Sequence, residues 1–156
     1  MMAIRCAAKA VILQNNRILL NQCETERGIV YYTLPGGGQH PYETMEEAVV
    51  REVAEETGYR SEVVRFLAMT EEIHDDPVVR ERFPDYTHRV LHIFLVRLLG
   101  EEAGAITETD SDQKGSVWMS LRDADTVTFR PASLSGQIGA LASGRCAPFL
   151  GTTHTM

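Results

Sequence analysis

Long hydrophobic runs are absent from this sequence of 156 residues. No apolar stretch approaches the roughly 20 residues that a membrane-spanning helix needs. The N-terminal residues 3–13 continue into an alternating, strand-like pattern, which favours a first β-strand over a signal peptide. We therefore expect a cytoplasmic protein that has no membrane partner.

Cysteine is also scarce. Cys6, Cys23 and Cys146 are odd in number, and none lies at a spacing typical of paired metal ligands. This pattern is typical of free thiols in a reducing compartment, and it argues against a disulfide framework or a zinc site built on cysteine.

Basic residues are not in excess. The chain has 15 Lys and Arg against 22 Asp and Glu, which gives a formal net charge of −7. A polymeric nucleic-acid partner would require a basic face, so we exclude one. A small anionic substrate stays compatible with this charge if a cation bridges the two. A homodimer is left open.

The remaining features indicate an ordinary globular domain, because 44% of the residues are hydrophobic, 24% are charged and no repeat or linker is visible. We expect one α/β domain with a mixed sheet over residues 1–156. The residues at 73–86 form a polar segment, those at 100–115 an acidic loop that contains glycine, and 143–156 is expected to be a loose tail. The patterns predict strands at 3–13, 17–23, 29–34, 61–72, 87–99 and 116–121, and helices at 45–57 and 131–142.

The helix at 45–57 has clear start and stop signals. Thr44 followed by Glu47 forms a capping-box pair, and Gly58 supplies the C-terminal stop. On a helical wheel, Glu52, Glu55 and Glu56 share one arc of roughly 100°, and this arc runs into the apolar face. Carboxylates next to a core are costly unless they are paired or bound to a cation.

One basic side chain in the helix, Arg51, can offset one of these charges but not three. A hard divalent cation would offset the rest through oxygen ligands, and Mg²⁺ or Mn²⁺ suits a cluster of carboxylates without His or Cys. The sequence therefore predicts a metal site on this helix. The preceding glycines at 36–38 allow a tight turn that can aim a backbone carbonyl at the ion.

A longer spacing now becomes visible: Gly, five residues, Glu, seven residues, then Arg-Glu-aliphatic-x-Glu-Glu-x-Gly. This pattern resembles the Nudix box. Seven of its positions specify one residue type, and at ~6–7% usage each, a chance match is on the order of one in a million. Tyr59 departs from the family, which usually has an aliphatic residue there. The matching residues are Gly37, Glu43, Arg51, Glu52, Val53, Glu55, Glu56 and Gly58.

The resemblance implies an α/β/α sandwich and hydrolysis of nucleoside diphosphates linked to another group. It implies that Arg51 orients the carboxylates through ion pairs and that the reaction uses Mg²⁺ or Mn²⁺. Catalytic roles fall on Arg51, Glu52, Glu55 and Glu56. The implied metal ligands are the Gly37 carbonyl, Glu52, Glu55 and Glu56, with Glu43 as a supporting ligand.

Several questions stay open at this point. Nucleoside triphosphates and ADP-sugars are both compatible substrates. A nucleotide-binding regulatory module without turnover, or an enzyme similar to the isoprenyl-diphosphate isomerases, is the alternative function. Phosphate or base contacts are open to Arg5 and Arg17, and base stacking to Tyr31, Tyr32 and Phe83. The general base is either Glu52 or one of the loop acids Glu101, Glu102, Glu108, Asp110 and Asp112.

Overall fold

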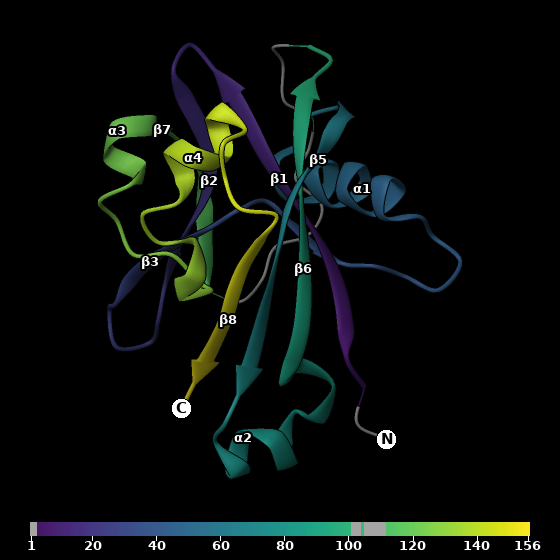
Figure 1. Ribbon diagram of the computed structural model, residues 1–156, viewed down its shortest axis with the longest axis vertical. Coiled ribbons are helices and arrows are strands. Elements are labelled where there is room, and N and C mark those ends of the chain that lie inside the picture. Colours follow the sequence, from purple (N-terminus) through teal and green to yellow (C-terminus); the bar gives the residue numbers. More distant parts are fainter. Residues whose placement is uncertain (1–2, 101–103, 105–111) are drawn as a thin grey trace.

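The computed structural model describes residues 3–100, 104 and 112–156. Its centre is an eight-stranded mixed sheet with the order β3-β2-β1-β6-β5-β8, in which β4 pairs with β1 and β7 pairs with β2 (Figure 1). The strands are β1 (Arg5–Gln14), β2 (Arg17–Glu24), β3 (Val30–Thr33), β4 (Gly36–Gly38), β5 (Ser61–His74), β6 (His88–Leu98), β7 (Gln113–Ser120) and β8 (Phe149–Thr155). The helices are α1 (Met45–Thr57), α2 (Pro77–Arg82), α3 (Leu121–Ala124) and α4 (Ile138–Ser143), with 3₁₀ turns at Pro84–Tyr86 and Ala132–Leu134.

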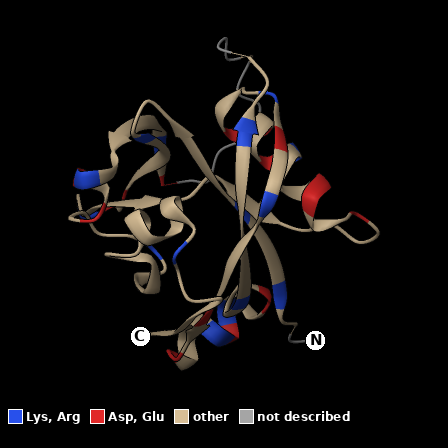
Figure 2. Ribbon diagram, turned by 45° about the horizontal axis from the view of Figure 1, so that its top comes forward, with Lys and Arg blue, Asp and Glu red and all other residues tan. Residues whose placement is uncertain are grey.

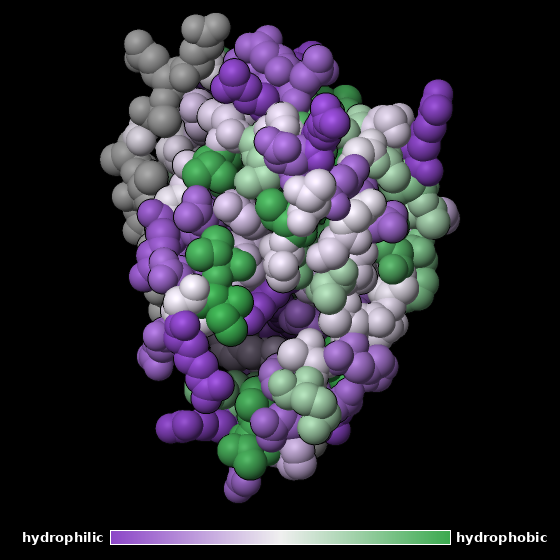
Figure 3. Space-filling model, turned by 90° about the vertical axis from the view of Figure 1, so that its left-hand side faces the viewer, coloured by the Kyte–Doolittle hydropathy of each residue, from purple (hydrophilic) through white to green (hydrophobic). Residues whose placement is uncertain are grey.

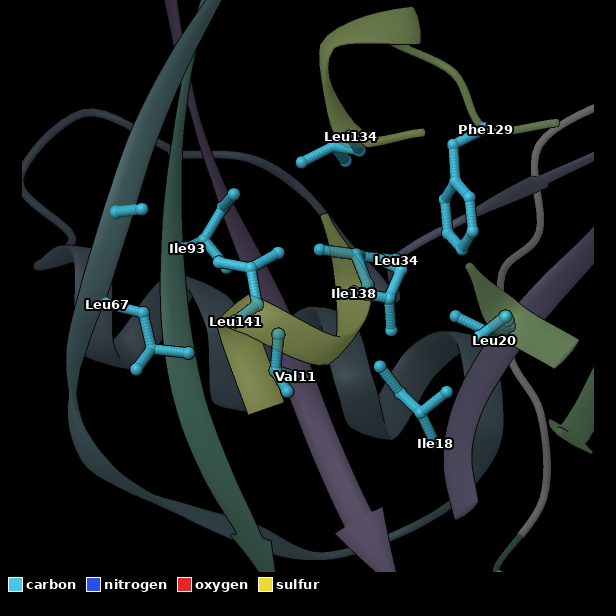
Figure 4. Close-up of a cluster of buried hydrophobic side chains, with 12 residues drawn as sticks. Val11, Ile18, Leu20, Leu34, Leu67, Ile93, Phe129, Leu134, Ile138 and Leu141 are labelled. Atoms are coloured by element: carbon cyan, nitrogen blue, oxygen red, sulfur yellow. The ribbon is translucent and has the colours of Figure 1, made fainter. Parts of the chain in front are cut away.

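Helices cover both faces of this sheet, and the alternation of β1 shows how. Ala8, Ala10 and Ile12 are buried against α1, whereas Val11 points to the opposite face. On that opposite face, α3 and α4 contribute to a second apolar cluster (Figure 4). Its buried side chains include Val11, Ile18, Leu20, Leu34, Leu67, Ile93, Phe129, Leu134, Ile138 and Leu141. The expected α/β/α sandwich with a mixed sheet is confirmed.

The short strand β4 positions the glycine run of the predicted site. It pairs antiparallel with β1, so that Gly37 lies opposite Ala8 and Gly36 lies opposite Lys9. A Cβ on Gly36 would lie 2.1 Å from the carbonyl oxygen of Ala8, and its φ of +136° is open mainly to glycine. The glycines therefore bring this segment close to β1 and to the face that α1 covers.

Three expectations about secondary structure are wrong in extent. The polar segment at 73–86 contains α2, which starts at the N-cap Asp76 and has only six residues, too few to show a helical period. The helix expected at 131–142 is divided into the 3₁₀ turn and α4, because Gly136 at φ +76° interrupts it. The expected loose tail at 143–156 contains β8, which pairs parallel with β5.

No helix in the described part of the chain is long and apolar enough to cross a membrane.

Candidate active site

Local sequence signals fix the helix that carries the glutamates. The Thr44 side chain accepts a hydrogen bond from the backbone N–H of Glu47 at 3.1 Å, and the Glu47 carboxylate accepts one from the N–H of Thr44 at 3.0 Å. Gly58 ends the helix in the left-handed conformation at φ +77°. Both predicted ends of α1 are confirmed. Figure 2 shows the acidic residues gathered on this helix.

Arg51 is the centre of an ion-pair group. Its Nε lies 2.6 Å from Glu43, and its Nη1 lies 3.0 Å from Glu52 and 3.2 Å from Glu55. Its Nη2 also donates to the Gly38 carbonyl at 3.0 Å. The hydrogen bond from Arg51, helped by the backbone N–H of His40, lowers the pKa of Glu43 to about 2.

Arg51 contacts several carboxylates through one planar guanidinium. It pairs with three at once because its donors point in several directions, in agreement with the expectation that it orients carboxylates through ion pairs and offsets only one charge. One positive charge still faces three negative ones, so the group keeps a net negative charge. We call this set Arg51, Glu43, Glu52 and Glu55 the arginine group.

Glu56 lies one turn after Glu52 on the same face of α1, and both line one cleft, but Glu56 has a different environment. Its side chain is buried, and Oε2 accepts hydrogen bonds from Asn21 Nδ2 and the Gly36 backbone N–H, each at 2.9 Å. Burial raises its pKa to about 7, and the nearby Lys9, the Gly36 N–H and Asn21 reduce that rise. A buried carboxylate held mainly by neutral donors is ready to accept either a proton or a cation.

Gly37 lets a carboxylate approach the backbone closely. A Cβ at this position would lie 2.7 Å from Cδ and from Oε1 of Glu52, so any side chain would displace that carboxylate. Lys9 reaches the same region from β1, where its Nζ donates to the Gly36 carbonyl at 3.0 Å. The glycine run thus brings backbone oxygen, two carboxylates and an ammonium group together.

These groups line a cleft with a volume of about 480 Å³, which we call the carboxylate cleft. Its walls carry Glu52 and Glu56 from α1 together with Asp112, the one described member of the predicted loop acids. Asp112 accepts a hydrogen bond from the Tyr31 hydroxyl at 2.9 Å. The basic side chains on its walls are Arg5, Lys9 and Arg89, and the aromatic ones are Tyr31 and Tyr86.

The structure brings only some of the predicted residues to this cleft. Gly37, Glu52 and Glu56 line it, whereas Glu43 and Glu55 are held by Arg51 and do not line it. Arg5 and Tyr31 line it, and Arg17, Tyr32 and Phe83 do not. Glu101, Glu102, Glu108 and Asp110 lie outside the described residues.

Sequence reasoning missed Lys9, Asn21 and Arg89. Lys9 lies in a strand whose flanking residues are apolar, so its inward position shows only when the β1–β4 pairing is known. Asn21 and Arg89 come from β2 and β6, and nothing in their local sequence connects them to the helix. Within residues 3–100, 104 and 112–156, no three His, Cys, Asp or Glu side chains stand as a ready metal-binding group.

Comparison with known proteins now decides the family. The model of the NUDIX domain matches residues 4–135, well over half of the chain. The chain belongs to the Nudix hydrolase family. The Nudix box at Gly37–Tyr59 lies inside the matched region and supplies α1 with its carboxylates.

Two curated relatives of this Nudix domain are similar over part of its length. It is 36% identical over 88 residues to the nucleoside triphosphatase NudI of Enterobacter sp. (strain 638), a match that covers 54% of this chain and 61% of that protein. It is 29% identical over 123 residues to the ADP-ribose pyrophosphatase of Methanocaldococcus jannaschii, covering 79% of this chain and 66% of that protein. The chain thus spans less than two thirds of each relative.

A solved structure shares the fold. The NUDIX hydrolase from Nitrosomonas europaea superposes with a TM-score of 0.70 at 19% identity, covering 94% of this chain and 93% of that chain. At this identity, the likeness concerns the fold alone.

Proposed function

We propose that this Nudix domain is a divalent-metal-dependent pyrophosphohydrolase that cleaves a nucleoside diphosphate linked to another group. One observation carries the proposal: carboxylates from the Nudix box and basic side chains from β1 and β6 meet in one cleft. A phosphate chain needs positive charge around it, and the chain as a whole is acidic. A cation held by the carboxylates would supply that charge beside Arg5 and Lys9.

The donor chemistry of the site fits Mg²⁺ or Mn²⁺. Glu52, Glu55, Glu56 and the Gly37 carbonyl offer hard oxygen ligands, with Glu43 beside them, and none of these groups is a thiolate or imidazole. Glu56 supports the fit, because a buried carboxylate with a raised pKa lacks a full countercharge. When bound, such an ion neutralises phosphate charge and lowers the pKa of coordinated water. Glu55 would bind the ion after its ion pair with Arg51 breaks.

The remaining residues of the cleft hold and orient the carboxylates, the glycine run and the phosphate chain of the substrate. Arg51 keeps the Glu52 carboxylate beside Gly37, and Lys9 fixes the glycine run through the Gly36 carbonyl. Arg5 and Lys9 face the space that a phosphate chain would occupy. A general base must take a proton from the attacking water. Asp112 suits that role better than Glu52, because Glu52 is already bound to Arg51.

The base assignment has a direct test. Asp112→Asn should lower kcat strongly and leave the stabilisation of the protein by metal ions intact. If Asp112→Asn keeps the wild-type kcat and Glu52→Gln loses it without a change in metal requirement, the role returns to Glu52. Asp112→Asn would also keep the wild-type kcat if one of the acids between residues 101 and 110 supplied the base.

The substrate class requires one panel assay. Release of phosphate, pyrophosphate and nucleoside monophosphate is measured with Mg²⁺ across nucleoside triphosphates, ADP-ribose, dinucleoside polyphosphates and sugar nucleotides. The names of the two curated relatives place nucleoside triphosphates and ADP-ribose first in the panel. Hydrolysis should require the divalent ion and yield a nucleoside monophosphate. Binding of these nucleotides without any turnover would favour a regulatory module instead.

A further inference from the structure

A second cleft, with a volume of about 740 Å³, opens beside the carboxylate cleft. The two share three wall residues, Lys9, Tyr31 and Arg89, so they form one continuous depression. We call this larger part the distal cleft. Figure 3, which looks onto the side where β3 lies, shows a hollow there with hydrophilic residues around its opening. A substrate whose phosphates lie near Glu52 would extend into this space.

Part of the distal cleft comes from chain beyond the matched family domain. The NUDIX match ends at residue 135, but the wall includes Thr153, His154 and Thr155 of β8, followed by Met156. Strand β8 is held by its parallel pairing with β5 and by a hydrogen bond between His154 Nδ1 and the Asp75 carboxylate at 2.8 Å. The distal cleft is therefore shaped by a segment that the matched domain does not include.

Arg130 provides a flat surface at the junction of the two clefts. Its guanidinium lies 4.0 Å from the centroid of the Tyr31 ring. Backbone pairing holds this stack, because Tyr32 N–H donates to Thr128 at 2.9 Å and Arg130 N–H donates to Tyr32 at 3.0 Å. Tyr31 is only 8% exposed and is fixed by its bond to Asp112, whereas Arg130 is exposed. One face of the guanidinium is thus covered by Tyr31, while Arg130 is exposed and lines the distal cleft.

The charges of the distal cleft do not favour a second phosphate. Arg89 is paired with Glu72 at 2.5 Å, and the Lys9 ammonium donates to the Gly36 carbonyl, in the glycine run that lines the carboxylate cleft. Arg130 has no ion pair among the described residues, but its charge lies against the Tyr31 ring. The floor includes the buried Leu91 and Phe129. A planar, weakly charged group with hydrogen-bonding edges suits these walls better than an anion does.

Unsatisfied polar atoms also favour a ligand with hydrogen-bonding edges. Among the described residues, three buried side-chain polar atoms lack a hydrogen-bond partner, and two of them, His74 Nδ1 and Gln113 Nε2, belong to residues that line the distal cleft. Such atoms are costly without a partner from water or a ligand. A small turn of the Gln113 amide would bring a donor to an acceptor on a ligand in this space.

We propose that the distal cleft binds the nucleoside part of the substrate, with the base stacked on the exposed face of the Arg130 guanidinium. This inference rests on the proposed function, because the phosphates must lie at the carboxylate cleft. Aromatic rings and guanidinium planes both stack on bases, and such contacts contribute about 1–3 kcal/mol per base. Arg130 is then a specificity-determining residue that discriminates nucleotides from other phosphate esters.

The test measures binding without turnover. The full chain is titrated by calorimetry with AMP, GMP, CMP, UMP and ribose 5-phosphate in the presence of EDTA. At least one nucleoside monophosphate should bind at least 10-fold more tightly than ribose 5-phosphate. Arg130→Ala should weaken that binding at least 10-fold. The matched control is Arg82→Ala, since Arg82 also lies over an aromatic ring, that of Phe83, but lines neither cleft.

Arg130→Lys separates stacking from charge, because it keeps the charge and removes the plane. It should weaken binding as Arg130→Ala does. Wild-type affinity in Arg130→Lys would overturn the stacking proposal in favour of an anion site. Equal binding of ribose 5-phosphate and nucleotide, or no nucleotide binding at all, would also overturn it.

A second measurement does not depend on the folding of variants. Amide chemical shifts of the wild-type chain should respond to the nucleoside monophosphate at Thr128, Arg130 and Thr153 more than to ribose 5-phosphate. Shifts confined to the carboxylate cleft would overturn the inference. Metal-dependent hydrolysis that does not change in the Arg130 variants would overturn nucleoside binding in the distal cleft but not the proposed function. Nucleotide binding in the distal cleft without metal-dependent hydrolysis would overturn the proposed function but not the binding site.

Discussion

The carboxylates around α1 are held by opposite means. In the arginine group, Glu43, Glu52 and Glu55 surround a permanent positive charge. Glu56, in contrast, is buried and accepts hydrogen bonds from two neutral donors, Asn21 and the Gly36 N–H. The pKa of Glu43 falls to about 2, and the pKa of Glu56 rises to about 7. Two glutamates of one short segment thus differ in pKa because their surroundings differ.

This difference indicates that the arginine group and Glu56 have different roles. In the arginine group, the hydrogen bond from Arg51 lowers the pKa of Glu43 and keeps that carboxylate ionised, and the ion pairs hold the group together without a metal ion. Glu56 changes its charge near neutrality and gains most from a divalent cation, because desolvation is what raises its pKa. The arginine group is therefore a fixed acidic group and Glu56 is a pH-responsive carboxylate, and the following experiments separate the two.

The largest expected effect is on catalysis. Glu56→Gln keeps the shape of the side chain and an acceptor for Asn21 but removes the charge. We expect kcat/KM to fall at least 100-fold, about 2.7 kcal/mol, as for loss of a group that stabilises charge in a preorganised site. Glu55→Gln should show a loss of similar size. The measurement is steady-state hydrolysis at limiting Mg²⁺.

The exposed Glu46 in the first turn of α1 supplies the matched control. Glu46→Gln should retain wild-type activity. Near-full activity in both the Glu55 and Glu56 variants would contradict the metal-binding role of the helix.

The next effect concerns stability and pH. Because the folded-state pKa of Glu56 is raised, the native protein holds a proton that the unfolded chain releases, so stability falls as pH rises from about 4.5 to about 7. A shift of this size corresponds to about 3 kcal/mol. Urea denaturation of the metal-free protein at a series of pH values measures it. Glu56→Gln should flatten the slope in this window. An equally steep slope in the variant would show that other groups cause it.

A smaller effect is expected from the arginine group. Arg51→Met removes the charge that three carboxylates share, and we expect a loss of about 1–3 kcal/mol in the free energy of unfolding, since the side chains are largely but not fully buried. Arg97 pairs with Glu62 at the surface and is the control. Arg97→Met should cost less than ~1 kcal/mol. Equal losses in both variants would mean that the arginine group adds nothing beyond a surface pair.

The sequence predicted the helical half of the site well and the sheet half poorly. Thr44, Glu47 and Gly58 act through neighbours within one turn, so the bounds of α1 follow from local chemistry. Lys9 and Asn21 reach the site only through strand pairing between distant segments. Pairing of that kind depends on the whole sheet, so a local pattern cannot reveal it.

The same reason explains the errors elsewhere. Strand β8 was taken for a loose tail because its partner, β5, lies far away in the chain and its own residues are mostly polar. Arg130 carries no signal of its own until the pairing of 128–130 with Tyr32 places it over Tyr31.

The smallest expected effect tests whether one ion binds both Glu55 of the arginine group and Glu56. An ion at ten times its dissociation constant should stabilise the native protein by about 1.4 kcal/mol, provided it binds only the folded state. Thermal melts with and without Mg²⁺ or Mn²⁺ measure this shift. Glu55 contacts Arg51 at 3.2 Å, the longest of the three ion pairs, so it is the carboxylate most easily transferred to the ion. Glu55→Gln should therefore reduce the shift, whereas Glu46→Gln should leave it intact. If Glu55→Gln retains the full shift while Glu56→Gln abolishes it, the ion binds Glu56 without Glu55, and Glu55 belongs only to the arginine group.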